Sequence, residues 1–360
     1  MSKQDYGDIV NDCHLCRGPA RVGTRCPQCG ALNSPKTSPE GGSTMSVKSS
    51  AFSLNGCRFE NRPSAAPTLS TPTIRLPDRV DLRVHCSPVE NQLRTNSCVA
   101  NAVVGAMEFH HLKAGRPLTD FSRLFVYYNA RILSNSTQKD EGSFIHHGMA
   151  SILAYGACEA SLWPFVEAMV LSTPPDTCYQ NGALYEAVQY ARAPRGVPAM
   201  TALAQGLPIV FGIFVPGEYY DIAAQTGRMP KPDQVVPQRP PSGHAMLIVG
   251  YDMTQRAYLV RNSWGDGWAE QGYCWIPFET MDAWSKEEDF WTVGAIEDAA
   301  GFSLQGPSLG DAMKAIGVPN DLLEARAARL NSLRSGLRSK LSSDLESAKK
   351  DFRSRLRDKS

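Results

Sequence analysis

The sequence has no hydrophobic run long enough to cross a membrane and no surplus of charge of one sign. Its longest apolar runs, such as MLIVGY at 246–251, have the length of a strand, whereas a membrane-spanning helix needs about 20 apolar residues. The first residues, MSKQDYGDIVNDC, contain no apolar export signal. The 37 basic and 36 acidic side chains nearly cancel, which excludes a global field that attracts nucleic acid or membranes. We expect a cytoplasmic protein, and export by a route that needs no signal peptide is not excluded.

Cysteine is too sparse for a disulfide-stapled scaffold, with ten in 360 residues. Four of the ten nevertheless lie together in the pattern C-x2-C-x9-C-x2-C. Two CxxC turns at this spacing present four thiolates tetrahedrally to Zn²⁺, and such a closed site leaves no position for a reacting water. We therefore predict a zinc-ribbon-like module over residues 1–30 that binds a structural zinc ion through Cys13, Cys16, Cys26 and Cys29. The module would hold a protein partner or stabilise itself; its few basic residues do not favour nucleic-acid binding.

A segment rich in small and polar residues follows over residues 31–75. Between 31 and 73, 22 of 43 positions are Ser, Thr, Pro or Gly, and these residues bury too little apolar surface to offset the entropy of ordering. We therefore predict a disordered linker. An apolar interruption around Phe52, Leu54 and Phe59 has two interpretations, docking on a neighbouring surface or a solvated linker, and we prefer the second.

Globular patterning extends over residues 76–300, and its two halves differ. In the first half, apolar residues recur at helical spacing; in the second, they form strand-length runs between Gly, Pro and polar turns. The predicted helices cover 98–112, 121–133, 147–155 and 182–191, and the predicted strands cover 207–215, 244–252, 257–263 and 272–278. This order indicates an α+β domain with a helical part first and a strand-rich part second.

Residues 301–360 form a charged tail with a stripe of leucines. Leucines recur every three or four positions from Leu330 to Leu345, which keeps them on one face of a helix. From 314 to 360 there are 12 basic and six acidic residues, which is the only concentrated charge of the sequence. We predict a basic amphipathic helix that packs on its own domain or self-associates, with an anionic surface or an acidic partner as the alternative.

One cysteine, one histidine and one asparagine form a candidate catalytic set. Cys98 opens the predicted helix 98–112, where the helix dipole favours a thiolate. His244 and Asn262 lie on two predicted strands joined by a short polar turn, so an antiparallel hairpin places them nearly opposite each other. Asn262 can then accept a hydrogen bond from one ring nitrogen of His244 while the other nitrogen faces the sulfur. Trp264 lies on the same side of the strand as Asn262 and would cover this hydrogen bond from water.

The segments around these residues resemble the signature blocks of a known family. PVENQLRTNSC, SGHAMLIVGYD and RNSWGDGWAEQGY are similar to the three blocks of papain-like cysteine peptidases, and the resemblance covers roughly residues 76–298. It implies an α+β fold in which a helical subdomain and a β-barrel-like subdomain enclose an active-site cleft. It also implies thiol-dependent hydrolysis of polypeptides, with Cys98 as the nucleophile and His244 as the base and acid. Asn262 would orient the imidazole, and Gln92 would donate to the oxyanion.

Further site residues follow from the same resemblance. Gly142 and Ser143 are similar to the cleft wall that pairs with a substrate backbone, and Gly243 and Trp264 flank the reacting groups as substrate-contacting residues. The segments SLWPF and LPIVFGIFV resemble bacterial members of the family. No cofactor is implied for catalysis.

Three positions beside Cys98 depart from the family pattern. Val99 replaces the usual aromatic residue, Asn96 replaces a glycine, and Thr95 replaces a disulfide-forming cysteine, whose loss fits a reducing compartment. The long helical inhibitory prosegment of the family also has no counterpart in the sequence. Two alternatives therefore stay open: an isopeptidase or acyltransferase that forms the same acyl-enzyme, and a non-catalytic adaptor that binds peptides.

Overall fold

The structure is a computed structural model that describes residues 10–12, 19–21, 52–59, 66–185, 189–294, 303–305, 308–315, 317–321, 323–324 and 328. The chain divides into two units, Met1–Ile316 and Gly317–Ser360, and the elements described below belong to the first. The four predicted zinc ligands and the leucine stripe of the predicted C-terminal helix lie outside the described residues. Within the described ranges, no helix has the length and apolar character that a bilayer crossing requires.

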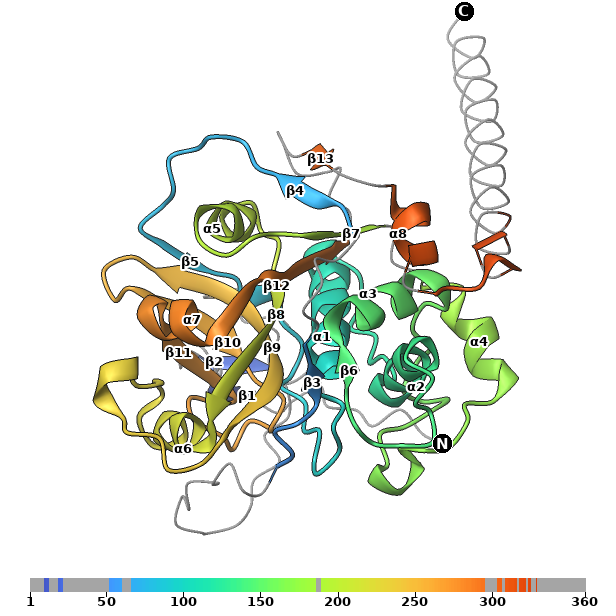
Figure 1. The fold of residues 1–360 in the computed structure, drawn as a ribbon, viewed down its shortest axis with the longest axis horizontal. Helices are drawn as coiled ribbons and strands as arrows, with labels where there is room; N and C mark the ends of the chain where they lie inside the picture. The colour runs from blue at the N-terminus through green and yellow to red at the C-terminus, as the bar shows by residue number, and fades with distance from the viewer. Residues whose placement is uncertain are drawn as a thin grey trace, which may run out of the picture. The chain divides into compact units, whose positions relative to one another are not determined.

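Helices make up one side of the domain, to the right of α1 in Figure 1. They are α1 (Cys98–Lys113), α2 (Arg123–Leu133), α3 (Ile145–Ala154) and α4 (Asp176–Gly182). The side chain of Ser122 accepts a hydrogen bond from the Phe125 N–H and caps the start of α2. α1 is buried almost all round because α2 and α3 pack on one part of its surface and the sheet packs on another.

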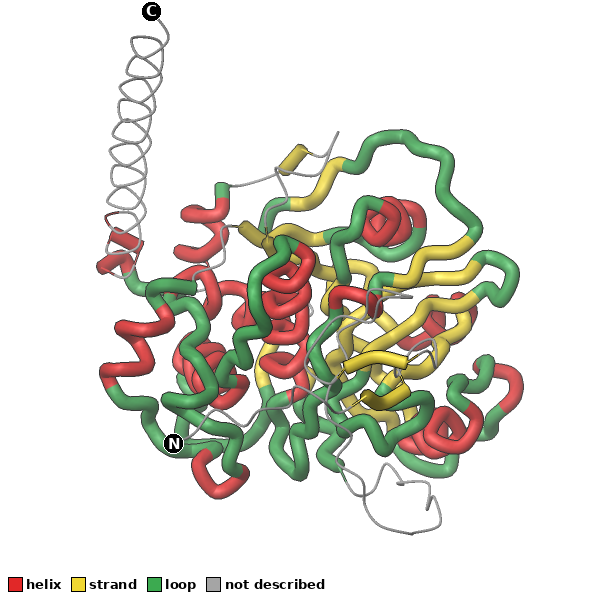
Figure 2. Tube along the Cα trace, turned by 180° about the vertical axis from the view of Figure 1, so that it is seen from behind, coloured by secondary structure: helices red, strands yellow, loops and turns green. Residues whose placement is uncertain are grey.

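The other side of the domain is a large, mainly antiparallel sheet, shown from behind in Figure 2. Nine strands of the described residues belong to it. Their order is β11 (Tyr273–Pro277), β10 (Ala257–Arg261), β9 (Pro241–Asp252), β8 (Ile209–Pro216), β12 (Ser285–Gly294), β7 (Gln189–Arg192), β4 (Thr68–Ser70) and β13 (Ser303–Gln305), with β5 (Arg79–Asp81) paired to β9. β9 is buried without a break from Gly243 to Asp252, because α1 and α5 (Val197–Ala204) both pack on it.

The remaining elements lie around these two parts. Three further helices are α6 (Gly217–Thr226), α7 (Phe278–Trp284) and α8 (Leu309–Ala315). Two short strand pairs are β1 (Val10–Asp12) with β2 (Pro19–Arg21), which is antiparallel, and β3 (Cys57–Arg58) with β6 (Ser143–Phe144), which is parallel. Gly227 caps the end of α6, and its φ of 71° is the left-handed conformation that glycine adopts without strain.

The predicted helix over 182–191 is wrong. α4 ends at Gly182, and Gln189–Arg192 form the strand β7. Tyr190 and Ala191 are buried there, and Ala191 pairs with Thr292 of β12. Pairing with a strand that is distant in the sequence therefore outweighs the helical spacing of the apolar residues.

The second half of the predicted linker also differs from the expectation. Residues 52–59 and 66–75 are described, and they include β3 and β4. Leu69 is 4% exposed, and Phe52 and Leu54 pack against the core of the sheet. The few apolar residues of a polar segment are thus sufficient to fix it on the domain, because each of them finds an apolar surface.

Two adjacent histidines at the start of α3 are buried. His146 is 7% exposed and His147 is 6% exposed, and Nδ1 of His147 lies 2.7 Å from the Ser134 hydroxyl. Burial lowers the pKa of His146 to about 4. Burial, together with the nearby His146 and Arg58, lowers the pKa of His147 to about 3. Both imidazoles are therefore neutral in the folded protein at neutral pH. Protonation at low pH would place a charge on a buried ring, which costs free energy.

We expect the substitution His147→Asn to flatten the acid limb of the stability curve. The folded pKa of His147 is about 3 and its ordinary value is 6.5. The stability that depends on the neutral His147 ring is therefore fully present above pH 6.5 and is lost as the pH falls towards 3. Between about pH 7 and pH 5, the unmodified protein should lose about 2 kcal/mol more unfolding free energy than the variant. Unfolding by denaturant at both pH values measures this difference, and equal losses would contradict the burial of a neutral ring.

Candidate active site

Cys98 is the first residue of α1, and its side chain is fully buried. Its sulfur accepts a hydrogen bond from the Ala245 N–H at 3.4 Å. Ala245 lies on β9, so this contact joins the start of the helix to the strand that carries His244. The N–H groups of Val99 and Cys98 also approach the sulfur and favour its anion, as expected at a helix N-terminus.

His244 and Asn262 are in direct contact. Nε2 of His244 lies 2.8 Å from Oδ1 of Asn262, and Nδ1 has no hydrogen-bond partner among the described residues. Oδ1 of Asn262 also accepts from the Ser263 N–H at 2.8 Å. The amide oxygen is therefore fixed from two sides, and it fixes the imidazole so that Nδ1 remains available for proton transfer.

The strand register places this pair differently from a regular hairpin. Arg261, the last residue of β10, pairs with Leu247 of β9, and the register shifts between Leu259 and Val260. Asn262 follows the end of β10, and His244 lies three positions before Leu247. The two residues are thus offset along the strands, and their side chains bridge the offset.

Aromatic rings surround the His244 imidazole. The Trp264 ring centre lies 4.9 Å from that of His244, and the Tyr220 ring meets the imidazole edge-on at 5.5 Å. Trp264 is 2% exposed. The hydrogen bond between His244 and Asn262 therefore lies in an apolar environment, where competition from water is weak.

The Gln92 side chain is fully buried, and both ends of its amide have partners. Nε2 donates to the Thr95 carbonyl at 2.9 Å, and Oε1 accepts from the Ser263 hydroxyl at 2.6 Å. An amide nitrogen carries two hydrogens, so one donor remains beyond the bond to Thr95. Gln92 is thus held rigidly beside the segment that leads to Cys98.

The predicted cleft-wall residues lie in close contact with residues 52–59. The Ser143 N–H donates to the Gly56 carbonyl at 3.0 Å, and β3 lies beside β6 in Figure 1. Gly142 has φ of 80°, and a Cβ on it would lie 2.4 Å from the Gly56 oxygen. A Cβ on Gly243 would lie 2.2 Å from the Cys57 oxygen. Both glycines are therefore required for the close approach of the segment.

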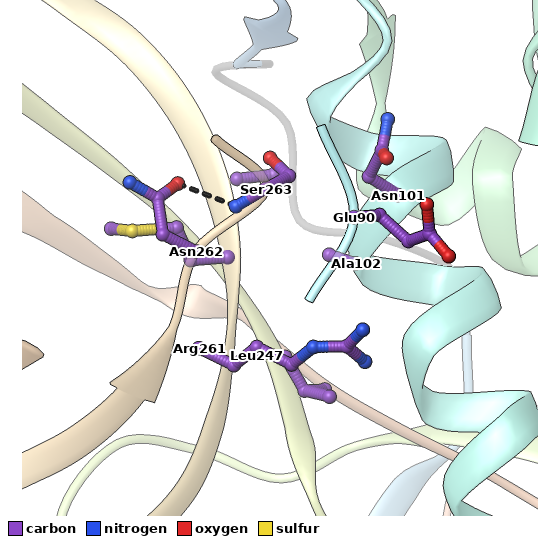
Figure 3. A pocket seen from close by; sticks show the side chains of 9 residues that line it. Glu90, Asn101, Ala102, Leu247, Arg261, Asn262 and Ser263 are labelled. Carbon is purple, nitrogen blue, oxygen red and sulfur yellow. Dashed lines mark hydrogen bonds between the residues drawn. The ribbon is translucent and has the colours of Figure 1, made fainter. Parts of the chain in front are cut away.

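A small cavity lies between the start of α1 and the strands that carry the site (Figure 3). Glu90 and Asn101 line its helical side, and Arg261, Asn262 and Ser263 line its strand side. Its volume of about 10 Å³ is that of a single water molecule at most. A peptide cannot enter a cavity of this size.

The sequence profile described as papain family cysteine protease matches residues 76–288, which is more than half of the chain. The chain belongs to the papain family of cysteine proteases. An uncharacterized peptidase C1-like protein of Acanthamoeba polyphaga mimivirus is 32% identical over 213 residues, a match that covers 56% of this chain and 68% of the viral protein. Human cathepsin O is 25% identical over 228 residues, and the match covers 60% of this chain and 65% of cathepsin O. The chain thus spans about two thirds of these two relatives.

Solved structures of the family share the fold. Xylellain, a cysteine protease from Xylella fastidiosa, aligns with a TM-score of 0.57 and 28% identity, covering 66% of this chain and 100% of xylellain. Procathepsin L 3 of the Tenebrio molitor larval midgut aligns with a TM-score of 0.52 and 21% identity, covering 67% of this chain and 76% of that protein. The expected papain-like α+β fold is confirmed, and the chain is a papain-family cysteine peptidase.

Several polar residues around the site were not predicted. The Ser263 hydroxyl donates a hydrogen bond to the Gln92 amide oxygen. Its position next to Asn262 in the sequence could have identified Ser263 as a site residue. The Asp140 carboxylate accepts from the Asn96 N–H at 3.0 Å and from the Tyr127 hydroxyl at 2.6 Å. Asn96, which stands where the family has glycine, is thus held in place by Asp140. No sequence pattern connects these residues, because they meet only in the folded chain.

Burial keeps both reacting groups neutral in this structure. It raises the pKa of the Cys98 thiol to about 12, although N–H groups led by that of Ala245 oppose the shift. It lowers the pKa of His244 to about 4, although the hydrogen bond to Asn262 opposes this shift. A thiolate and imidazolium pair therefore requires that solvent or a substrate replace the apolar cover of the site.

We expect no Cys98 thiolate in the full-length protein from about pH 5 to pH 9, because the thiol pKa of about 12 lies well above this range. The ultraviolet absorbance of the thiolate measures it directly. The spectrum of Cys98→Ser is subtracted at each pH to remove the signals of the other cysteines. A thiolate signal that rises with a midpoint below neutral pH would contradict this expectation.

Proposed function

We propose that the chain hydrolyses peptide bonds through a Cys98, His244 and Asn262 site and an acyl-enzyme intermediate. The observation that carries the proposal is the oriented imidazole, with Nε2 held by Asn262 and Nδ1 without a partner among the described residues. The next residue on the same strand, Ala245, contacts the Cys98 sulfur. One strand therefore brings the base and the nucleophile to the same place, as thiol catalysis requires.

The proposed reaction begins when a peptide lies beside Cys98. Nδ1 of His244 takes the proton of the Cys98 thiol, and the sulfur forms a bond to the peptide carbonyl carbon. The Cys98 N–H and the second hydrogen of the Gln92 amide stabilise the oxyanion. His244 returns the proton to the leaving nitrogen as the C–N bond breaks. Water then attacks the thioester, gives one proton to His244, and releases the acid as the proton returns to the sulfur.

The alternatives differ in what accepts the acyl group or in whether any reaction occurs. An isopeptidase or acyltransferase would use the same first half-reaction, and no contact among the described residues favours an amine acceptor over water. An adaptor needs no oriented imidazole, so the His244 and Asn262 contact favours an enzyme. That the chain is a bacterial-type member of the family remains part of the proposal.

The N-terminal cysteines are proposed to bind one structural zinc ion. β1 and β2 form an antiparallel pair in which Val10 pairs with Arg21. Cys13 and Cys16 lie between these two strands in the sequence, and two cysteines at this spacing can bind one zinc ion. We propose that this module contacts a protein partner, and that the basic C-terminal tail self-associates or meets an anionic surface, in a cytoplasmic enzyme.

Cys98→Ala and His244→Ala should each lower peptide turnover by about three orders of magnitude or more, because each removes a group that takes part in bond making. Asn262→Ala should cost less, because it only releases the orientation of the imidazole. Initial rates on a mixture of fluorogenic peptides measure this order. Unchanged turnover in Cys98→Ala would remove the mechanism.

Metal analysis of the purified full chain should find one zinc ion per molecule, and Cys16→Ser or Cys26→Ser should lose it. Cys86→Ser should retain zinc, because Cys86 is buried within the peptidase domain. Absence of stoichiometric zinc from the full chain would contradict the proposal.

A further inference from the structure

One carboxylate joins the segment before the nucleophile to the predicted cleft wall. The Asp140 side chain accepts hydrogen bonds from the Asn96 N–H, with its two oxygens 3.0 Å and 3.2 Å from that nitrogen. The Asn96 side-chain amide donates in turn to the Asp140 carbonyl at 2.6 Å. Asn96 is thus bound to residue 140 through both its main chain and its side chain. Pairing at two points fixes orientation as well as distance, and Cys98 follows only two residues later.

The Tyr127 hydroxyl, on α2, connects the same carboxylate to the wall. It donates to Oδ1 of Asp140 at 2.6 Å and accepts from the Gly142 N–H at 2.9 Å. Tyr127 is fully buried, so competition from water for these bonds is weak. One side chain therefore sets the distance between the Asp140 carboxylate and Gly142. Asn96, Tyr127, Asp140 and Gly142 are called the Asp140 cluster below.

Arg131 holds the segment that leads to Asp140. It lies one turn after Tyr127 on α2, and its guanidinium carbon is 4.0 Å from the centre of the Tyr127 ring. Its Nη1 donates to the Lys139 carbonyl at 2.7 Å and to the Thr137 carbonyl at 3.3 Å. The Arg131 side chain is fully buried, and its positive charge interacts with Asp140. The Asp140 cluster is therefore supported by a helix and by a buried cation.

Other hydrogen bonds of the segment before Cys98 run within it or to α1. The Thr95 hydroxyl donates to the Gln92 carbonyl at 2.8 Å and lies 2.7 Å from the Ser97 hydroxyl. The Asn101 amide donates to the Ser97 carbonyl at 3.0 Å. These bonds fix the shape of the segment, whereas Asp140 fixes its position against the wall. Thr95 stands where the family has a disulfide-forming cysteine, so hydrogen bonds hold this segment without a cross-link at that position.

We propose that Asp140 is a positioning residue, which sets the place of the Cys98 N–H and sulfur by holding Asn96. The proposal rests on the proposed function in taking the Cys98 N–H as a donor to the oxyanion. It extends that function, because it gives a role in the reaction to a carboxylate and to a residue that departs from the family pattern. A donor must lie about 3 Å from the oxyanion to stabilise it. A small shift of the segment would therefore weaken the stabilisation.

The charge of Asp140 has a second effect, which opposes the first. Burial raises the pKa of the Cys98 thiol, and the negative charge of Asp140 adds to this rise, because a negative charge disfavours a neighbouring anion. Loss of the carboxylate should make the sulfur more reactive towards a small reagent. The same loss should place the sulfur less well for peptide hydrolysis. A side chain that only stabilises the fold would not produce these two opposite changes.

The test compares five full-length proteins: the unmodified chain, Asp140→Ala, Asp140→Asn, Tyr127→Phe and Glu141→Gln. Asp140→Ala removes both the hydrogen bonds and the charge. Asp140→Asn removes the charge but keeps an oxygen that can accept from Asn96 and Tyr127. Tyr127→Phe removes the hydroxyl and leaves the charge. Glu141→Gln is the matched control, because it removes one negative charge at the next position, where Glu141 forms only an exposed ion pair with Arg58 at 3.3 Å.

Two measurements are made on proteins that thermal unfolding shows to be folded. One is kcat and KM for the fluorogenic peptide that the unmodified chain cleaves fastest. The other is the rate of Cys98 alkylation by iodoacetamide at pH 8, followed by residue-level mass spectrometry.

Asp140→Ala should lower kcat at least about tenfold and change KM less than about threefold, because it removes positioning that acts in the transition state. Asp140→Asn should keep kcat within about threefold of the unmodified chain. Alkylation of Cys98 should be about two- to fivefold faster in both Asp140 variants. Tyr127→Phe should lower kcat and also raise KM, because it releases Gly142 of the predicted wall. The control should match the unmodified chain in all three quantities.

Two results would overturn the proposal for Asp140. One is a kcat of Asp140→Ala within about threefold of the unmodified value. The other is an Asp140→Asn protein as slow as Asp140→Ala, since the charge and not the placement of Asn96 would then matter. Absence of peptide turnover in all five proteins would instead remove the proposed hydrolase activity. Alkylation then decides the proposal: a faster rate in Asp140→Ala than in Glu141→Gln supports it, and equal rates overturn it.

Discussion

The hydrogen bond from the Ala245 N–H to the Cys98 sulfur determines where the helical part and the sheet meet. It depends on β9, a long strand that stays buried because helices cover it. A strand fixed on both edges by β8 and β10 has little freedom to slide, since a shift of one residue would turn every side chain to the other face. The position of His244 relative to Cys98 is therefore a property of the sheet as a whole.

The helix that starts at Cys98 and the strands that carry His244 and Asn262 were predictable, because each is a long segment with regular apolar spacing. The contact between His244 and Asn262 was predictable because a short turn joins their strands. The strand β7 was not, because its partner β12 lies far along the chain. A local pattern cannot show which distant partner a short segment will find.

The position of residues 52–59 could not be predicted from the amino-acid composition, for a related reason. Serine, proline and glycine dominate the surrounding sequence, and an average over such a segment indicates disorder. Its fixed position depends instead on Phe52 and Phe59. Their partners are Trp264, which follows the end of β10, and Phe214, which lies on β8. The role of Asp140 could not be predicted either, because it depends on the hydrogen bond that its carboxylate accepts from the Asn96 N–H.

The parallel pairing of β3 with β6 has a consequence for the order of folding. A contact between distant segments forms only after the chain between them has closed into a loop, which costs entropy and slows folding. The two strands lie far apart in the sequence, so the first of them can pair only after the helical part that carries β6 has folded.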